Sequence, residues 1–356
     1  MDAIRQFSLR YPISLFLLIS FSWTWLFWFG SLLFNDNWAI RKIITGMGFG
    51  PAIAAIVLSV LAGKRCLRNN HKWWGWFIAS FALLFISYLS MLLTGDSISA
   101  AALTQATPPG LSALNLLLCA VSAFIGAFIV AATLGGDAPV FSGYLSVRRG
   151  VIWLLFASAL PALWLLAGLA VAYIRSETPS GVMADLGWLT WLGYSIRSVL
   201  FTLLVVAIGE ELGWRGWLLP ALQQRFNTLF SSVLLGVAWG LWHFPLFING
   251  SYNEPPQMVF AKVGLCICLS IVFSFFYNRT AGNVLVAILL HTALNSSQRF
   301  IPLSEHMGLF MLATILLLPF IDKMWRKDAS TVSGHKRCAK IRATTEAGTK
   351  NQADPA

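Results

Sequence analysis

The sequence predicts an all-α protein, a polytopic transmembrane helical bundle of about ten helices, within a range of eight to ten. The first observation is composition, because only 11% of the 356 residues are charged while 57% are hydrophobic, with a mean hydropathy of +0.71. A soluble domain carries about 25% charged residues. The second observation is that apolar runs of about 20 residues, each long enough to cross a bilayer, recur along the chain. We therefore expect an integral membrane protein.

Ten apolar segments are expected to span the membrane. They lie near residues 11–34, 43–62, 74–94, 112–134, 151–174, 188–210, 229–248, 259–277, 282–298 and 307–325. The first run is about twice as long as the apolar part of a signal peptide, so we interpret it as a helix. Residues 188–225 and 229–248 are expected to form a helical hairpin that turns near Asn227.

Loop charges predict the orientation in the membrane. With an even number of spans both termini share one side, and that side carries most of the Lys and Arg residues, namely Arg5, Arg10, Lys64, Arg65, Arg68, Lys72, Arg148, Arg149, Arg225, Arg279, Lys323, Arg326 and Lys327. Such residues collect in the cytoplasm, so we expect a multi-pass protein of the inner (plasma) membrane with both termini cytoplasmic. This asymmetry accounts for much of the net charge of +11, and no stacking platform or basic groove points to nucleic acid. The lipid bilayer is the expected partner.

The chain is expected to contain three regions. Residues 1–145 hold N-terminal transmembrane helices whose role the sequence leaves open, and residues 146–326 hold the region with the polar motifs. Residues 327–356 form a basic tail without periodicity, which predicts disorder on the cytoplasmic side. The five scattered cysteines do not predict a disulfide framework.

Ionisable residues lie in or beside three apolar segments of the second half of the chain. The sixth span carries Glu210 and Glu211 with Arg215 close behind, the seventh carries His243, and the ninth carries His291 with Asn295. A charged residue at the centre of a membrane helix costs about 2.5–3.5 kcal/mol on insertion scales, so such residues usually mark a function. Their types suit acid–base chemistry, which predicts a catalytic centre within the bilayer.

The spacing of these residues suggests roles. Glu211 and Arg215 are i, i+4, the favoured order for an ion pair on one helix face. Glu210 points about 100° away from Glu211 and has no local partner, which suits a general base near neutral pH. Trp239 precedes His243 by four residues, so its indole can line the imidazole.

His291 and Asn295 are also i, i+4 and share a helix face. An imidazole N–H and an amide NH₂ at these positions could together stabilise a developing oxyanion. Taken singly, each motif has a simpler explanation: an ion-paired helix end for the glutamates, an interfacial residue for His243, and a hydrogen-bonded link between helices for His291 and Asn295. Their occurrence together and in this order favours a function.

Glu210-Glu211-x-x-x-Arg215, Trp239-x-x-x-His243 and His291-x-x-x-Asn295 together resemble the three-motif signature of the CPBP family. That family comprises type II CAAX prenyl endopeptidases and bacteriocin-processing or immunity proteins, and is also called the abortive-infection family. The similarity covers residues 188–298, and the segments around the first two motifs are similar to bacterial members. Trp239 stands where the family often has Phe, and the N-terminal helices exceed the usual number.

The resemblance implies an intramembrane endopeptidase that acts on membrane-associated protein or peptide substrates. It implies that Glu210 and His243 activate a water molecule, that His291 and Asn295 bind the oxyanion, and that Glu211, Arg215 and Trp239 support the site. No cofactor is certain. Zinc or another divalent metal bound by Glu210, His243 and His291 is the alternative, although no His-Glu-x-x-His motif is present.

Two functions from other classes remain open. A non-catalytic membrane scaffold or bacteriocin-immunity protein could keep the same fold and bind a partner without cleaving it. A proton-coupled transporter could use the buried Glu, His and Arg residues as a relay, although the sequence shows no convincing inverted repeat.

Overall fold

The computed structural model describes residues 6–8, 10–34, 37–62, 71–94, 111–135, 145–147, 150–178 and 188–327, and every regular element within them is helical. The elements of the first half are α2 (Pro12–Gly30), η1 (Ser31–Phe34), α3 (Trp38–Thr45), α4 (Gly50–Leu61), α5 (His71–Thr94), α7 (Ala113–Leu134) and α8 (Val151–Ile174). The predicted tail beyond residue 327 and several loop charges used for the orientation, among them Arg5, Lys64, Arg65, Arg68, Arg148 and Arg149, lie outside the described residues.

The second half continues with α9 (Trp188–Phe201), η2 (Thr202–Ala207), α10 (Ile208–Gly213), η3 (Trp214–Leu218), α11 (Leu219–Gln223), α12 (Thr228–Trp242), α13 (Phe244–Ile248), η4 (Pro256–Met258), α14 (Val259–Arg279), α15 (Val284–Ser296), η5 (Ser297–Arg299) and α16 (Met307–Asp322). The predicted hairpin is present, because α11 ends at Gln223 and the Asn227 side chain caps α12 by accepting from the Phe230 N–H.

Eight helices of the described residues are long and apolar enough to cross a membrane. They cover Pro12–Phe34, Trp38–Leu61, His71–Leu93, Ala113–Leu134, Val151–Ile174, Trp191–Gln223, Thr228–Ile248 and Pro256–Arg279. The remaining two predicted spans correspond to α15, with 13 residues, and α16, with 16. At 1.5 Å per residue α15 is only about 20 Å long. The predicted polytopic helical bundle is therefore confirmed, at the lower end of its range for full-length spans.

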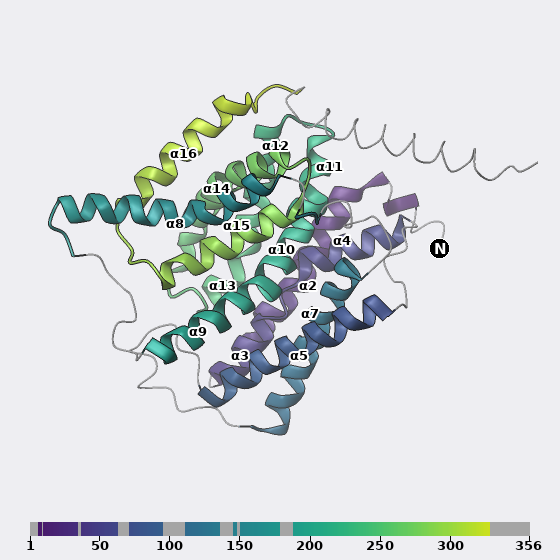
Figure 1. The fold of residues 1–356 in the computed structure, drawn as a ribbon. Coiled ribbons are helices and arrows are strands. Elements are labelled where there is room, and N and C mark those ends of the chain that lie inside the picture. Colours follow the sequence, from purple (N-terminus) through teal and green to yellow (C-terminus); the bar gives the residue numbers. More distant parts are fainter. Residues whose placement is uncertain are drawn as a thin grey trace, which may run out of the picture.

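Three groups of helices lie across the bundle. Figure 1 shows the α5–α7 pair at one edge and α8 with α16 at the other, with α2, α10 and α15 between them. α12 packs along α14, α4 packs against both α2 and α10, and α15 packs against α8 and η2. The motif-bearing helices therefore lie in the interior of the bundle.

Two glycines of α12 allow its close packing against α14. A Cβ atom added at Gly236 would lie 2.4 Å from Ile267 Cα, and one added at Gly240 would lie 2.5 Å from Val263 Cα. These glycines are four residues apart, the small-xxx-small spacing that lets membrane helices approach closely. The contact fixes α12, which ends just before His243, against α14, which carries Lys262.

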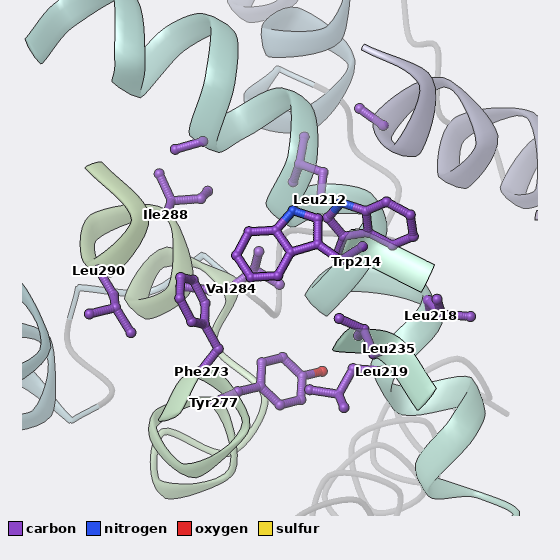
Figure 2. Packing of buried hydrophobic residues seen from close by; sticks show 14 of the residues in the cluster. Leu212, Trp214, Leu218, Leu219, Leu235, Phe273, Tyr277, Val284, Ile288 and Leu290 are labelled. Atoms are coloured by element: carbon purple, nitrogen blue, oxygen red, sulfur yellow. The ribbon is translucent and has the colours of Figure 1, made fainter. Parts of the chain in front are cut away.

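An apolar layer surrounds the motif-bearing segments. Figure 2 shows Leu212 and Trp214 of the Glu-bearing helix, Phe273 and Tyr277 of α14, and Ile288 of α15 within one cluster of buried apolar side chains. Trp214 and Phe273 are fully buried. This packing excludes water from one side of the Glu-bearing helix and so isolates the charges that face that side.

The N-terminal helix α2 is attached directly to the end of α12. The Trp25 indole donates to the Trp242 carbonyl oxygen at 3.0 Å, and the buried Asn249 amide donates to the Trp28 carbonyl at 3.1 Å and to Ser31 Oγ at 3.0 Å. The N-terminal helices therefore take part in building the region around His243.

Candidate active site

The helix that carries the two glutamates is interrupted by π-helical turns on both sides of them. η2 (Thr202–Ala207) precedes α10, and η3 (Trp214–Leu218) follows it. Pro220 has no N–H and its ring crowds the carbonyl one turn earlier, so a wider turn immediately before it relieves the conflict. Each π turn rotates the helix face that follows. The direction in which the Glu210 and Glu211 side chains point therefore depends on the π-helical turns η2 and η3, and a regular helix would point them elsewhere.

Glu211 is the centre of a closed ionic cluster with Arg215 and His291. Both of its carboxylate oxygens lie 2.9 Å from Arg215 Nη1, and Oε1 also accepts a hydrogen bond from His291 Nδ1 at 2.7 Å. Arg215 Nη2 donates to Ser270 Oγ at 3.2 Å. Glu211 and Arg215 are both 0% exposed. The predicted i, i+4 ion pair is present, while the bond to His291 adds a partner from another helix.

Two aromatic rings enclose the guanidinium of this ionic cluster. Its carbon lies 4.0 Å from the centre of the Phe273 ring and 4.4 Å from that of the Trp239 ring. Aromatic faces attract cations, and they do so more strongly where water is excluded. Arg215 is therefore stabilised by a carboxylate, a hydroxyl and two aromatic rings. Because these groups bury it completely, Arg215 is not available to a substrate.

Glu210, by contrast, lines a cavity. Its Oε2 accepts a hydrogen bond from Trp239 Nε1 at 2.6 Å, and the side chain is buried. The sequence suggested that Trp239 would line His243, and the ring centres do lie 6.0 Å apart. The indole hydrogen bond to Glu210 was not foreseen, because a spacing within α12 carries no information about a partner on α10.

His243 is placed by the end of α12. The helix ends at Trp242 and α13 begins at Phe244 with Pro245 in its first turn, so His243 occupies the junction. Its Nδ1 lies 2.7 Å from the Trp239 carbonyl oxygen. Since a carbonyl can only accept, Nδ1 donates, and Nε2 of the neutral ring keeps a lone pair for proton transfer or ligation.

His291 and Asn295 both line the same cavity as Glu210 and His243, in keeping with the sequence analysis. His291 is buried, whereas Asn295 is exposed on the outside of the bundle as well as lining the cavity. Because His291 Nδ1 is used by Glu211, only Nε2 remains for a ligand. That atom donates a hydrogen bond only when it carries a proton.

The cavity has a volume of about 350 Å³ and contains residues that the sequence did not single out. Lys262 of α14 and Tyr252 of the preceding loop line it, as do Trp28 of α2 and Lys42 of α3. The signal for Lys262 was present, because it is a charged residue within an apolar span. Trp28 and Lys42 gave no such signal, since their sequence neighbourhood contains no polar motif.

Zinc was one possibility from the sequence, with Glu210, His243 and His291 as ligands. Each histidine keeps its Nε2 while Nδ1 binds a carbonyl or carboxylate oxygen, an arrangement common among zinc ligands. However, no group of three His, Cys, Asp or Glu side chains within the described ranges is close enough to hold a metal ion. The described side chains therefore do not form a ready metal site.

Fold and site together define a multi-pass helical membrane protein with a cavity between its helices that is lined by ionisable and apolar side chains. Residues 191–297 match the family described as type II CAAX prenyl endopeptidase Rce1-like. The chain is also 33% identical over 138 residues to CAAX prenyl protease 2 of Methanococcus maripaludis. The aligned region covers 36% of this chain and 51% of that protein. The chain therefore spans about half the length of this curated relative.

The match confirms the resemblance that the three motifs suggested for this region. It includes Glu210, His243 and Asn295, whereas Trp28 and Lys42 of the same cavity lie outside it. The similar region thus contains the predicted catalytic residues, and a part of the chain beyond it completes the cavity wall.

Proposed function

We propose that this protein is an intramembrane endopeptidase that hydrolyses a peptide bond of a membrane-associated protein or peptide. The observation that carries the proposal is the convergence of Glu210, His243 and His291 on one cavity that lies among apolar helices. The similarity of residues 191–297 to type II CAAX prenyl endopeptidases supports the same reaction.

In the proposed mechanism a water molecule binds between the Glu210 carboxylate and His243 Nε2. Glu210 accepts one proton from this water as the oxygen attacks the scissile carbonyl carbon. The carbonyl becomes a tetrahedral oxyanion, which the Asn295 amide and a protonated His291 Nε2 stabilise by hydrogen bonds. Glu211 stabilises that imidazolium. Glu210 then gives its proton to the leaving amine as the C–N bond breaks.

The test is cleavage by the purified full-length protein in lipid nanodiscs. Substrates are fluorogenic peptides with an apolar C-terminal segment, with and without a prenylated cysteine. Glu210→Gln should lower the cleavage rate by about 10²–10⁴-fold, the usual contribution of a general base, and His243→Ala should also abolish most of it. The matched control is Glu305→Gln, an exposed glutamate in the loop before α16.

If the Glu210→Gln protein cleaved the peptides as fast as the wild type, the role of Glu210 as general base would be wrong. Failure of the wild type to cleave any peptide, with a cellular phenotype that survives Glu210→Ala, would favour a scaffold or immunity protein. Proton uptake that follows substrate transport would favour a transporter. Repeating the assay with a chelator and then with added zinc tests the metal alternative.

We also infer that both termini face the cytoplasm and that the protein lies in the inner (plasma) membrane. The asymmetry of Lys and Arg residues between the loops supports this orientation. A reporter fused to the C-terminus should be active only in the cytoplasm. Labelling of that reporter from outside intact cells would contradict the orientation.

A further inference from the structure

The junction between α12 and α13, which carries His243, has little support of its own. α13 contains only five residues, and a helix this short gains most of its stability from packing against other elements. Pro245 in its first turn provides no backbone N–H. The position of the His243 ring relative to Glu210 therefore depends on contacts with other parts of the chain.

Helix α2 and the turn η1 that follows it hold this junction from both sides. Before the junction, Trp25 Nε1 donates to the Trp242 carbonyl oxygen at 3.0 Å. After it, the Asn249 amide donates to the Trp28 carbonyl oxygen at 3.1 Å and to Ser31 Oγ at 3.0 Å. These three bonds join residues 217 to 221 positions apart in the sequence. We call Trp25, Trp28, Ser31 and Asn249 the α2 brace.

Asn249 is the buried centre of the α2 brace. It is 2% exposed, and its Oδ1 accepts from the Ser251 N–H at 3.0 Å while its amide nitrogen donates to α2 and η1. Gly250, with a φ of +73°, completes this turn. The turn returns the chain to His243, where the Tyr252 ring stacks on the imidazole with 6.1 Å between their centres. One side chain thus fixes both the α2 contact and the turn that covers His243.

The Trp28 ring of the α2 brace also packs against the junction. Its centre lies 4.4 Å from that of the Trp242 ring and 6.2 Å from that of the His243 ring. Trp28 Nε1 donates to the Thr45 carbonyl oxygen at 2.8 Å, and a Cβ added at Gly48 would lie 2.5 Å from that nitrogen. Because the Trp28 ring is confined in this way, it limits how far His243 can move.

We propose that the α2 brace, with Asn249 at its centre, positions His243 for the activation of water. None of Trp25, Ser31 and Asn249 is among the described residues that line the cavity, so they act through His243 as positioning residues. This proposal rests on the endopeptidase function proposed above, and it gives α2, which lies outside the family match at 191–297, a role in catalysis. The alternative is that the α2 brace only stabilises the fold.

The experiment measures kcat and KM of the full-length protein in nanodiscs with the fluorogenic peptides. Asn249→Ala should lower kcat by about 10–10²-fold and leave KM unchanged, because a displacement of about 1 Å at a reacting group has an effect of this size. Trp25→Phe, which removes one of the three bonds, should lower kcat by a smaller factor. The matched control is Trp23→Phe. Trp23 lies on the same helix and its Nε1 donates to the Met47 carbonyl oxygen at 3.0 Å, away from the junction, so this variant should keep the wild-type kcat.

A double-mutant cycle tests whether Asn249 acts through its contact with η1. Ser31→Ala removes one of the two acceptors of the Asn249 amide and should lower kcat by a smaller factor than Asn249→Ala. The double variant should be no slower than Asn249→Ala alone, because the effects of residues that act through one contact are not additive. Losses of kcat that multiply in the double variant would overturn the proposal, as would variants that lose stability but keep the wild-type kcat.

A measurement without substrate separates this proposal from the proposed function. NMR of the protein with ¹⁵N-labelled histidine reports the tautomer of each ring, and loss of a signal in His243→Gln assigns that residue. In the wild type, His243 Nδ1 carries the proton that it donates to the Trp239 carbonyl oxygen.

Asn249→Ala should move the His243 signal toward the tautomer mixture of an unrestrained imidazole, whereas Trp23→Phe should leave it in place. Such a shift supports the α2 brace even if no peptide is cleaved. If Asn249→Ala does not fold, Trp25→Phe provides the same test. A His243 signal that stays unchanged in the folded variant refutes the positioning role and leaves the endopeptidase function intact.

Discussion

Two adjacent glutamates of one helix lie in opposite environments. Glu211 lies inside the ionic cluster, where Arg215 and His291 use both of its oxygens. Glu210 lines the cavity and receives one side-chain hydrogen bond, from the Trp239 indole. Because neighbouring helical positions differ by about 100°, a single turn can direct one carboxylate to a structural role and the next to a ligand.

The difference shows how a membrane interior can hold a reactive carboxylate. A buried charge is costly unless it is paired and hydrogen-bonded. The ionic cluster satisfies this condition and links the Glu-bearing helix to α15, because Glu211 and Arg215 come from the former and His291 from the latter. Glu210 is kept in place by its neighbours and is left with an oxygen that can bind water.

The largest effect is expected from Arg215→Leu, which breaks the ionic cluster. Glu211 would remain as a buried charge without its main partner, and the free energy of unfolding should fall by about 3–5 kcal/mol. Equilibrium unfolding in detergent measures this change. The control is Arg279→Leu, because Arg279 pairs with Asp322 at a partly exposed site. Its substitution should lower the free energy of unfolding by about 1 kcal/mol or less. Equal losses in both variants would contradict the structural role of the cluster.

Trp28→Ala tests the cavity side of the comparison. Trp28 is 5% exposed, its indole donates to the Thr45 carbonyl at 2.8 Å, and its ring lies 4.4 Å from that of Trp242. Its removal should lower the free energy of unfolding by about 3 kcal/mol. It should also enlarge the cavity, so peptides with bulkier ends should be cleaved faster relative to smaller ones. Trp76→Ala, on a 47% exposed tryptophan, is the matched control. Unchanged preference for peptide size would show that α2 does not shape the cavity.

Gly213→Ala should displace the segment that carries both glutamates. A Cβ at this position would lie 2.3 Å from the Pro51 backbone of α4, so the two helices must separate, at a cost of about 1–3 kcal/mol. Gly264→Ala has open space around it and should stabilise its helix by up to about 1 kcal/mol. Thermal unfolding of both variants tests this prediction, and a stabilised Gly213→Ala protein would contradict the observed packing.

The smallest effect is expected at the exposed ion pair between Arg175 and Glu177. A hydrogen bond from Arg175 and another with His306 lower the pKa of Glu177 below its ordinary value. The folded state therefore binds fewer protons here than the unfolded state, and the stabilisation should be lost as the pH falls from about 6 to about 3. Melting curves of wild type and Glu177→Gln should differ slightly at the upper pH and coincide at the lower one. A difference that grows with acidity would have the wrong sign.

Much of the architecture could be predicted from the sequence, because a membrane constrains it strongly. In lipid, helices of this composition satisfy the hydrogen bonds of their backbone N–H and C=O groups internally. The turn near Asn227 could be predicted because its side chain caps the helix that follows. The Glu211–Arg215 pair was also predictable, because i, i+4 contacts lie within one helix. The catalytic roles of Glu210, His243, His291 and Asn295 remain predictions.

Contacts between helices could not be predicted in the same way. The bonds from Trp239 to Glu210 and from His291 to Glu211 depend on how far each helix is rotated, and the π turns η2 and η3 change that rotation locally. Sequence spacing assumes a regular helix. The wall formed by Trp28 and Lys42 was missed for another reason, since apolar packing brings distant segments together without a local motif.

The central claim is that Glu210 performs the chemistry while Glu211 supports the structure. It is tested most directly by comparing Glu210→Gln with Glu211→Gln for both peptide cleavage and the free energy of unfolding. Glu210→Gln should lose cleavage and keep wild-type stability, whereas Glu211→Gln should be clearly destabilised. A Glu210→Gln protein that still cleaves, or a Glu211→Gln protein as stable as the wild type, would contradict the account.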